Sequence, residues 1–170
     1  MLYGQRKSLL RKNILLRNIG RIINRERDWV SNIKDIVTGI KAKYKTDCPY
    51  ELAALRNINI HRRDLGQIHG YYYNAYRVKQ IYLNCNLTRY EERFVLAHEL
   101  GHSVLHPNAN TPFLKANTYL SVEKMEIEAN KFALYLLISD EDLREYKEFS
   151  LEQVARIFGY HEQLIQLRTQ

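Results

Sequence analysis

The sequence lacks several features that would assign it to a class at once. It has only two cysteines, Cys48 and Cys85, in 170 residues, and they do not have the CxxC spacing of a metal or redox site. Charged and polar residues interrupt the leucines of the N-terminus, so the apolar segment of a secretion signal is missing. No apolar run approaches the roughly 18 residues that a membrane span requires. We therefore expect a cytoplasmic protein with reduced thiols and no membrane association.

Charge is abundant but unevenly distributed. Residues 1–45 contain 12 Lys or Arg and three acidic residues, a net charge of +9, whereas the whole chain carries +7. A basic N-terminal segment suits an acidic partner such as nucleic acid, and it is equally compatible with solvated charge alone. Leucines and isoleucines between these charges indicate an amphipathic helix. We expect residues 1–30 to form a basic arm or helix, with a weak contact to DNA as one of its roles.

Residues 31–87 combine helical and strand signals. Apolar side chains at helical spacing predict a packing helix over 31–44, and a short helix with proline in its first turn follows over 49–56. NINIH, residues 57–61, alternates apolar and polar side chains as a strand does. The Tyr-, Val- and Ile-rich stretch 66–87 predicts two or three further antiparallel strands.

The second half of the chain is helical. Thr88 and Glu91 have capping-box spacing and begin a long helix that reaches His106. Ser121 is the expected N-cap of a second long helix. Three short helices are expected after it: one capped by Ser139 or Asp140, one that begins at Ser150 in a capping box with Gln153, and a last one over HEQLIQLR, residues 161–168.

Residues 95–106, VLAHELGHSVLH, place His98 and His102 one helical turn apart. Both imidazoles therefore point the same way, roughly 6 Å apart along the axis, and one metal ion can bind both. Zinc prefers a tetrahedron, and a catalytic site uses three protein ligands and leaves one position for water. Glu99, about 100° around the helix from His98, is placed to take a proton from that water. The HExxH motif predicts a zinc site with Glu99 as the general base.

The third ligand has several candidates. His106 follows His102 by four residues, whereas the metzincin motif HExxHxxGxxH requires six. Because His106 lies about 12 Å beyond His98 along the helix, packing or a contact to a ligand is its favoured role.

A carboxylate of the second long helix is the preferred third ligand. EKMEIEANKFA contains Glu123, Glu126 and Glu128. Glu126 adjoins the apolar stripe and precedes Asn130 by one turn, whereas Glu123 and Glu128 fit solvated charges better. We predict that Glu126 binds the metal and that the Asn130 amide hydrogen-bonds a ligating histidine.

Three stretches, DLGQIHGYYY, FVLAHELGHSVLH and EIEANKFALYLLI, resemble in this order the ImmA/IrrE family of zinc-dependent metallopeptidases, over about residues 31–165. The resemblance implies that His98, His102 and Glu126 bind zinc and that Glu99 is catalytic. It also implies a substrate, because family members cleave a helix-turn-helix repressor encoded nearby and so derepress a prophage or mobile element. Two departures are visible: ISDED replaces the family's Met-Pro after LL, and residues 1–28 exceed its usual start.

These observations predict an α+β fold, with a small antiparallel sheet packed against a zincin-type helix pair and further helices at both termini. Residues 31–138 are the expected metallopeptidase core. Residues 139–170 are expected to form a helical, helix-turn-helix-like element within the same compact unit.

The expected function is a zinc-dependent endopeptidase that cleaves or inactivates a helix-turn-helix repressor. The alternative is a non-proteolytic regulator that binds DNA or a repressor through its basic arm and C-terminal helices. The Tyr-rich strand is a candidate edge for pairing with an extended peptide. The donor to the oxyanion stays open among five residues, each of which has ordinary packing as its other role: His69, Tyr71, Tyr72, Tyr73 and His161.

Overall fold

The computed structural model describes residues 33–108 and 119–169. The predicted basic arm, residues 1–30, lies outside them. The first described element is a helix over residues 33–44. The others, in chain order, are α2 (Pro49–Leu55), β1 (Ile58–Arg63), β2 (Gly70–Ala75), β3 (Val78–Asn84), α3 (Arg89–Leu105), α5 (Tyr119–Leu137), α6 (Asp140–Glu145), α7 (Leu151–Phe158) and α8 (Glu162–Thr169).

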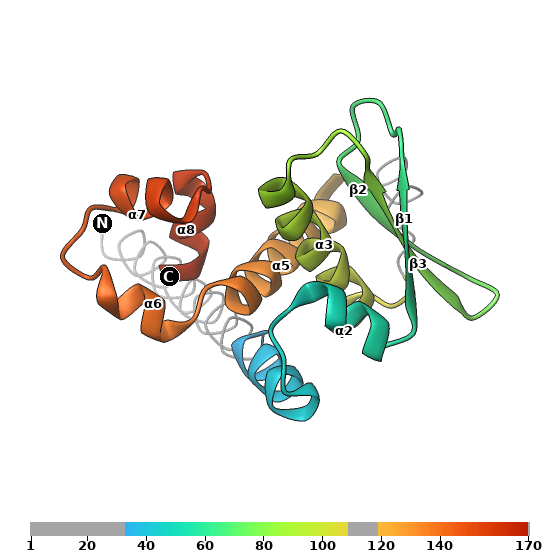
Figure 1. Cartoon of the computed structure of the whole chain (residues 1–170), viewed down its shortest axis with the longest axis horizontal. Coiled ribbons are helices and arrows are strands. Elements are labelled where there is room, and N and C mark those ends of the chain that lie inside the picture. Colours follow the sequence, from blue (N-terminus) through green and yellow to red (C-terminus); the bar gives the residue numbers. More distant parts are fainter. Residues whose placement is uncertain (1–32, 109–118, 170) are drawn as a thin grey trace, which may run out of the picture.

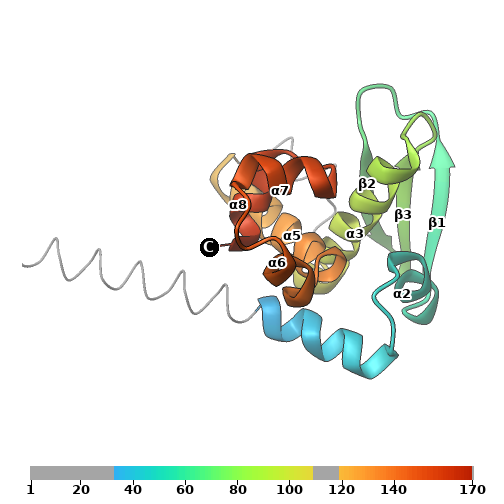
Figure 2. The same ribbon diagram turned by 60° about the vertical axis from the view of Figure 1, so that its left-hand side comes forward.

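The predicted α+β class is confirmed. In Figure 1 the sheet occupies one end of the molecule and α6–α8 the other, with α3 and α5 between them. Within the described residues, the helices lie on one side of the sheet (Figure 2). No helix among these residues has the length and apolar character needed to cross a membrane.

The sheet is mixed, so the prediction of antiparallel pairing is wrong for one of its two strand pairs. Its order is β1-β3-β2, and β3 is antiparallel to β2 but parallel to β1. The β2–β3 hairpin turns through Tyr76 and Arg77, both with positive φ (51° and 65°), which suits the twist of a tight hairpin. Residues 64–69 connect β1 to β2, and β3 lies between these two strands in the sheet. Strand propensity marks strands but does not say which of them are neighbours.

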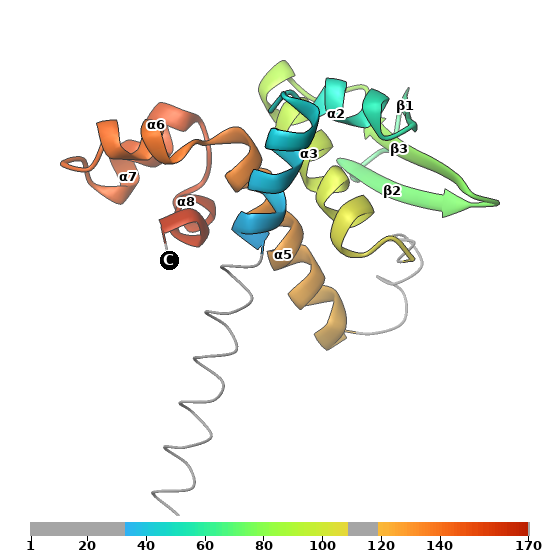
Figure 3. The same ribbon diagram turned by 90° about the horizontal axis from the view of Figure 1, so that it is seen from below.

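α3 begins with the predicted capping box, in which Thr88 accepts from the Glu91 N–H and the Glu91 carboxylate accepts from Thr88. It lies between the sheet and α5 (Figure 3). Its approach to β2 is close, since a Cβ on Gly70 would lie 2.7 Å from Val95 Cγ1. Buried side chains from the 33–44 helix, α2, the sheet, α3 and α5 form one core, which includes Val37, Leu52, Tyr72, Ile81, Leu96 and Phe132.

The C-terminal helices form a second, smaller core on the distal end of α5, around Leu134, Ile138, Val154, Ala155 and Ile165. Ser150 caps α7 through the predicted capping box, and of the two caps considered for α6, Ser139 or Asp140, it is Ser139 that caps the helix, also in a capping box. The cap predicted at Ser121 is wrong, because α5 already begins at Tyr119. A serine marks a helix start only where the preceding backbone leaves the helical region, and this depends on tertiary contacts.

Candidate metal centre

Three predicted ligands converge between α3 and α5. His98 Nε2 lies 3.1 Å from His102 Nε2 and 3.2 Å from Glu126 Oε2, and His102 Nε2 lies 3.7 Å from Glu126 Oε1. Two ligands bound to zinc at about 2.05 Å and at the tetrahedral angle are about 3.3 Å apart. These donor atoms therefore already have the spacing of a tetrahedral zinc site, and their chemistry, two imidazoles and one carboxylate, suits that ion.

Asn130 orients one of the candidate ligands. Its Oδ1 lies 2.8 Å from His98 Nδ1, so an Nδ1–H donates to the amide oxygen and Nε2 keeps a lone pair. That lone pair faces Glu126 and His102. An outer partner that fixes the tautomer in this way is a regular feature of metal-ligating histidines.

The site has negative electrostatic character. Burial lowers the pKa of His98, but the hydrogen bond that the protonated imidazolium donates to Glu126 and the charges of Glu99 and Glu126 outweigh it, so the pKa is raised above its usual value. A surrounding that favours the charged imidazolium also favours a metal cation at the same place.

Glu99 stands beside this cluster on α3 and is not one of its three ligands. Its side chain is buried, with 5% exposure. A buried carboxylate beside the candidate metal ligands is suited to proton transfer with a water at that place.

A glycine lets the two ligand-bearing helices approach closely. A Cβ on Gly101 would lie 3.1 Å from Ala129 Cα and 3.1 Å from Phe132 Cβ. Gly101 directly precedes His102, and Ala129 directly precedes Asn130. A close contact of α3 with α5 therefore lies among the candidate ligands.

The other candidate ligands lie elsewhere. His106 contacts Glu128, with 3.2 Å between Nε2 and Oε2, and is not in the His98, His102 and Glu126 group. Glu128 is buried and also pairs with Lys124 at 3.6 Å, so its interpretation as a solvated charge is wrong. The helical pattern of α5 alone did not indicate that His106, at the end of α3, contacts Glu128.

The candidate oxyanion donors are dispersed. Tyr72 is buried in the core, Tyr71 stacks on Tyr82 on the sheet, and His69 and His161 are exposed. Sequence reasoning missed two aromatic rings nearer to the cluster. Phe94, one turn before His98, has its ring centroid 6.4 Å from that imidazole. Tyr160 packs on Phe94 with 5.1 Å between centroids, a contact without any local sequence signal.

Comparison with known proteins assigns this arrangement to a family. Residues 53–169 match the IrrE N-terminal-like domain, peptidase family M78. The chain is 46% identical over 139 residues to "Uncharacterized immunity region protein 2" of Bacillus phage phi105, covering 80% of this chain and 88% of that protein. It is 32% identical over 131 residues to "Metallopeptidase ImmA" of Bacillus subtilis (strain 168), covering 75% and 78% of the two proteins.

A solved structure shares the fold. A Mycobacterium tuberculosis transcriptional regulator aligns with 83% of this chain, with a TM-score of 0.51 and 13% identity. The chain spans about half of that regulator, 46% of its length. The match to the M78 domain and the two relatives show more: this chain belongs to the ImmA/IrrE family of metallopeptidases.

Proposed function

We propose that this protein is a zinc-dependent endopeptidase whose ion is held by His98, His102 and Glu126. The observation that carries the proposal is the spacing of these three donor atoms, 3.1 to 3.7 Å, which matches the edge of a zinc tetrahedron. Asn130 holds His98 in the ligating orientation.

The bound zinc and Glu99 have separate roles in the proposed reaction. Bound zinc supplies Lewis acidity for the peptide carbonyl and acidifies water. Glu99 accepts the proton of the attacking water and passes it to the leaving amine, since it is buried next to a ligand.

The proposed substrate is a helix-turn-helix repressor of a prophage or mobile element, whose cleavage derepresses that element's genes. An immunity region protein and a metallopeptidase among the relatives support this proposal. An extended segment of the substrate pairs with β2, which is an edge strand among the described residues and packs against α3. Tyr73 of β2 is 37% exposed and is available to contact a side chain of such a segment.

The test uses the full-length protein with zinc and a repressor encoded next to it, with products resolved by mass. Glu99→Gln is expected to keep about one zinc per chain and to lose 100-fold or more in cleavage rate. Glu123→Gln is the matched control, because Glu123 is an exposed glutamate on α5. Unchanged cleavage by Glu99→Gln would refute the role of Glu99, and His102→Gln that still binds zinc tightly would refute the site.

The alternative function, DNA binding by the C-terminal helices, meets a physical objection. Residues 139–169 contain seven acidic and four basic residues, so the net negative charge of this element disfavours contact with a DNA backbone. The only basic residue of α8, Arg168, is buried and bonded to Ile138 O. A DNA contact, if the protein makes one, then belongs to the basic arm, and deleting residues 1–28 should flatten the salt dependence of binding.

A further inference from the structure

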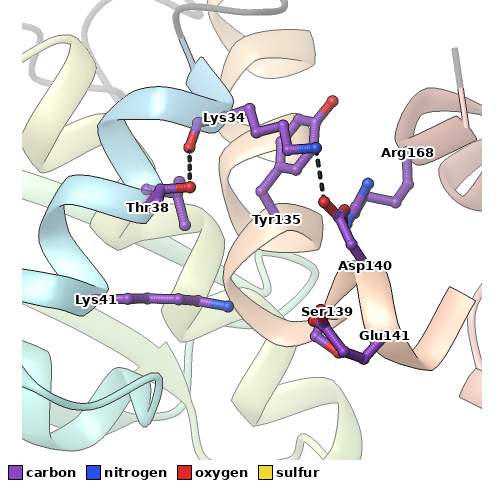
Figure 4. Close-up of a pocket in the computed structure, with 9 residues that line it drawn as sticks. Lys34, Thr38, Lys41, Tyr135, Ser139, Asp140, Glu141 and Arg168 are labelled. Carbon is purple, nitrogen blue, oxygen red and sulfur yellow. Dashed lines mark hydrogen bonds and ion pairs between the residues drawn. The ribbon is translucent and has the colours of Figure 1, made fainter.

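A cavity lies away from the metal centre, at the junction of the core with the C-terminal helices. Its volume is about 260 Å³, and its walls come from the 33–44 helix, α5, α6 and α8. Figure 4 shows Lys34 and Lys41 reaching across it from one helix towards α6. Tyr135 and Arg168 close its other side.

Most charges around the cavity already have partners. Lys34 Nζ lies 2.6 Å from Asp140 Oδ2, and Arg168 also pairs with Asp140. Arg168 further donates to Ile138 O and lies over the Tyr135 ring, 4.3 Å from its centroid. Glu141 pairs with Arg144 at 2.6 Å. Both acidic residues of the lining are therefore engaged by cations.

Lys41 is the exception. Among the described residues its ammonium makes no hydrogen bond or ion pair, and it points across the cavity towards Ser139 and Glu141 (Figure 4). Burial, and to a smaller extent the charge of Arg168, lower its pKa, although Asp47, Asp142 and Asp140 attract it from a distance. A partly desolvated charge without a counterion carries a free-energy cost that a bound anion removes.

We propose that this cavity binds a phosphate group, held by Lys41 together with Lys34. An ammonium has three donors, so Lys34 is able to contact an anion while it keeps Asp140. A phosphate carries about −1.5 to −2 charges near pH 7 and three acceptor oxygens. It can therefore accept from two lysines at once, and its charge is greater than that of a single carboxylate. The cavity volume suits a small phosphate-bearing molecule.

The probe is inorganic phosphate, titrated into the zinc-loaded full-length protein by calorimetry at pH 7.5 and constant ionic strength. Lys41→Met removes the charge inside the cavity. Lys43→Met is the matched control, because it removes the same charge from an exposed position on the same helix. We expect the wild type and Lys43→Met to bind alike, and Lys41→Met to bind at least tenfold more weakly.

A third variant, Lys41→Arg, keeps the charge and is expected to bind within a few-fold of the wild type, which separates loss of charge from loss of folding. Methionine relieves the desolvated charge, so the melting temperature of Lys41→Met should not fall. Equal affinities of Lys41→Met and Lys43→Met would overturn the proposal, as would an absence of binding to the wild type.

Discussion

The contact of Gly101 with α5 offers the sharpest test of how the metal centre is built. In Gly101→Ala the new methyl would lie 3.1 Å from Ala129 Cα and from Phe132 Cβ, and 3.2 Å from Ala129 O. Carbon atoms in contact prefer about 3.5–4.0 Å, so the two carbon contacts are short by about 0.4–0.9 Å. Ala129 Cα and O are backbone atoms of α5, and Phe132 Cβ is bonded directly to that backbone. A change of rotamer therefore gives no relief, and the helices must separate.

Separation of the helices should weaken metal binding as well as lower stability. Overpacking costs about 1–3 kcal/mol, and the helix propensity of alanine over glycine returns about 1 kcal/mol. The free energy of unfolding without metal should therefore fall by no more than about 2 kcal/mol. Metal-to-ligand distances, however, tolerate only about ±0.2 Å. We expect zinc affinity to fall roughly tenfold, about 1.4 kcal/mol, because Glu126 moves with α5 while both histidines stay on α3.

Competition with a chromophoric chelator measures the affinity, and urea denaturation of the metal-free protein measures stability. Gly39→Ala is the control, because a Cβ at Gly39 has nothing within 4 Å. It should stabilise the protein by about 0.5–1 kcal/mol and leave zinc affinity unchanged. A Gly101→Ala protein with zinc affinity within twofold of the wild type would show that this helix contact does not set the ligand spacing.

Three further predictions concern single side chains. Asn130→Leu should weaken zinc binding about 10- to 100-fold through loss of the bond to His98 Nδ1, seen in the same competition assay. His106→Gln should change it less than threefold, because His106 faces Glu128; a large loss would make His106 a ligand. The Asp140 pKa is lowered from 3.8 to about 2, chiefly by Lys34 and Arg168, so its ionised form stabilises the fold above pH 3.8 and this contribution disappears as the pH falls through 2. With its side chain 40% exposed, we expect Asp140→Asn to cost about 1 kcal/mol at pH 7 and the difference from wild type to shrink below pH 4 in urea titrations.

Local sequence signals predicted the elements that carry the site. Capping boxes located the starts of α3 and α7 because the two side chains of such a box satisfy the first backbone donors, a purely local event. The spacing of His98 and His102 required only helix geometry. Glu126 was singled out because its position beside an apolar stripe indicates which face meets a neighbour, and the structure places it beside both histidines.

Features that depend on distant residues were not predictable from these patterns. The parallel pairing of β1 with β3 depends on where β3 inserts. The burial of Glu128 results from His106 on another helix, and the contact of Tyr160 with Phe94 joins residues 66 positions apart in the sequence. The crossing at Gly101 had a signal that was not used: small residues at facing positions, Gly101 and Ala129, allow helices to approach closely.

The two sites share α5, which gives a final prediction. Glu126 and Asn130 lie on α5 before Tyr135, which lines the cavity of Lys41. The close contact at Gly101 leaves α5 little freedom to shift without changing the distance from Glu126 to His98. Phosphate in the cavity should therefore alter zinc affinity, and by linkage zinc should alter phosphate affinity by the same factor. Zinc titrations with and without phosphate should show a change in the wild type and Lys43→Met that is absent in Lys41→Met. If all three proteins respond alike, phosphate acts at the metal centre itself and the cavity has no influence on it.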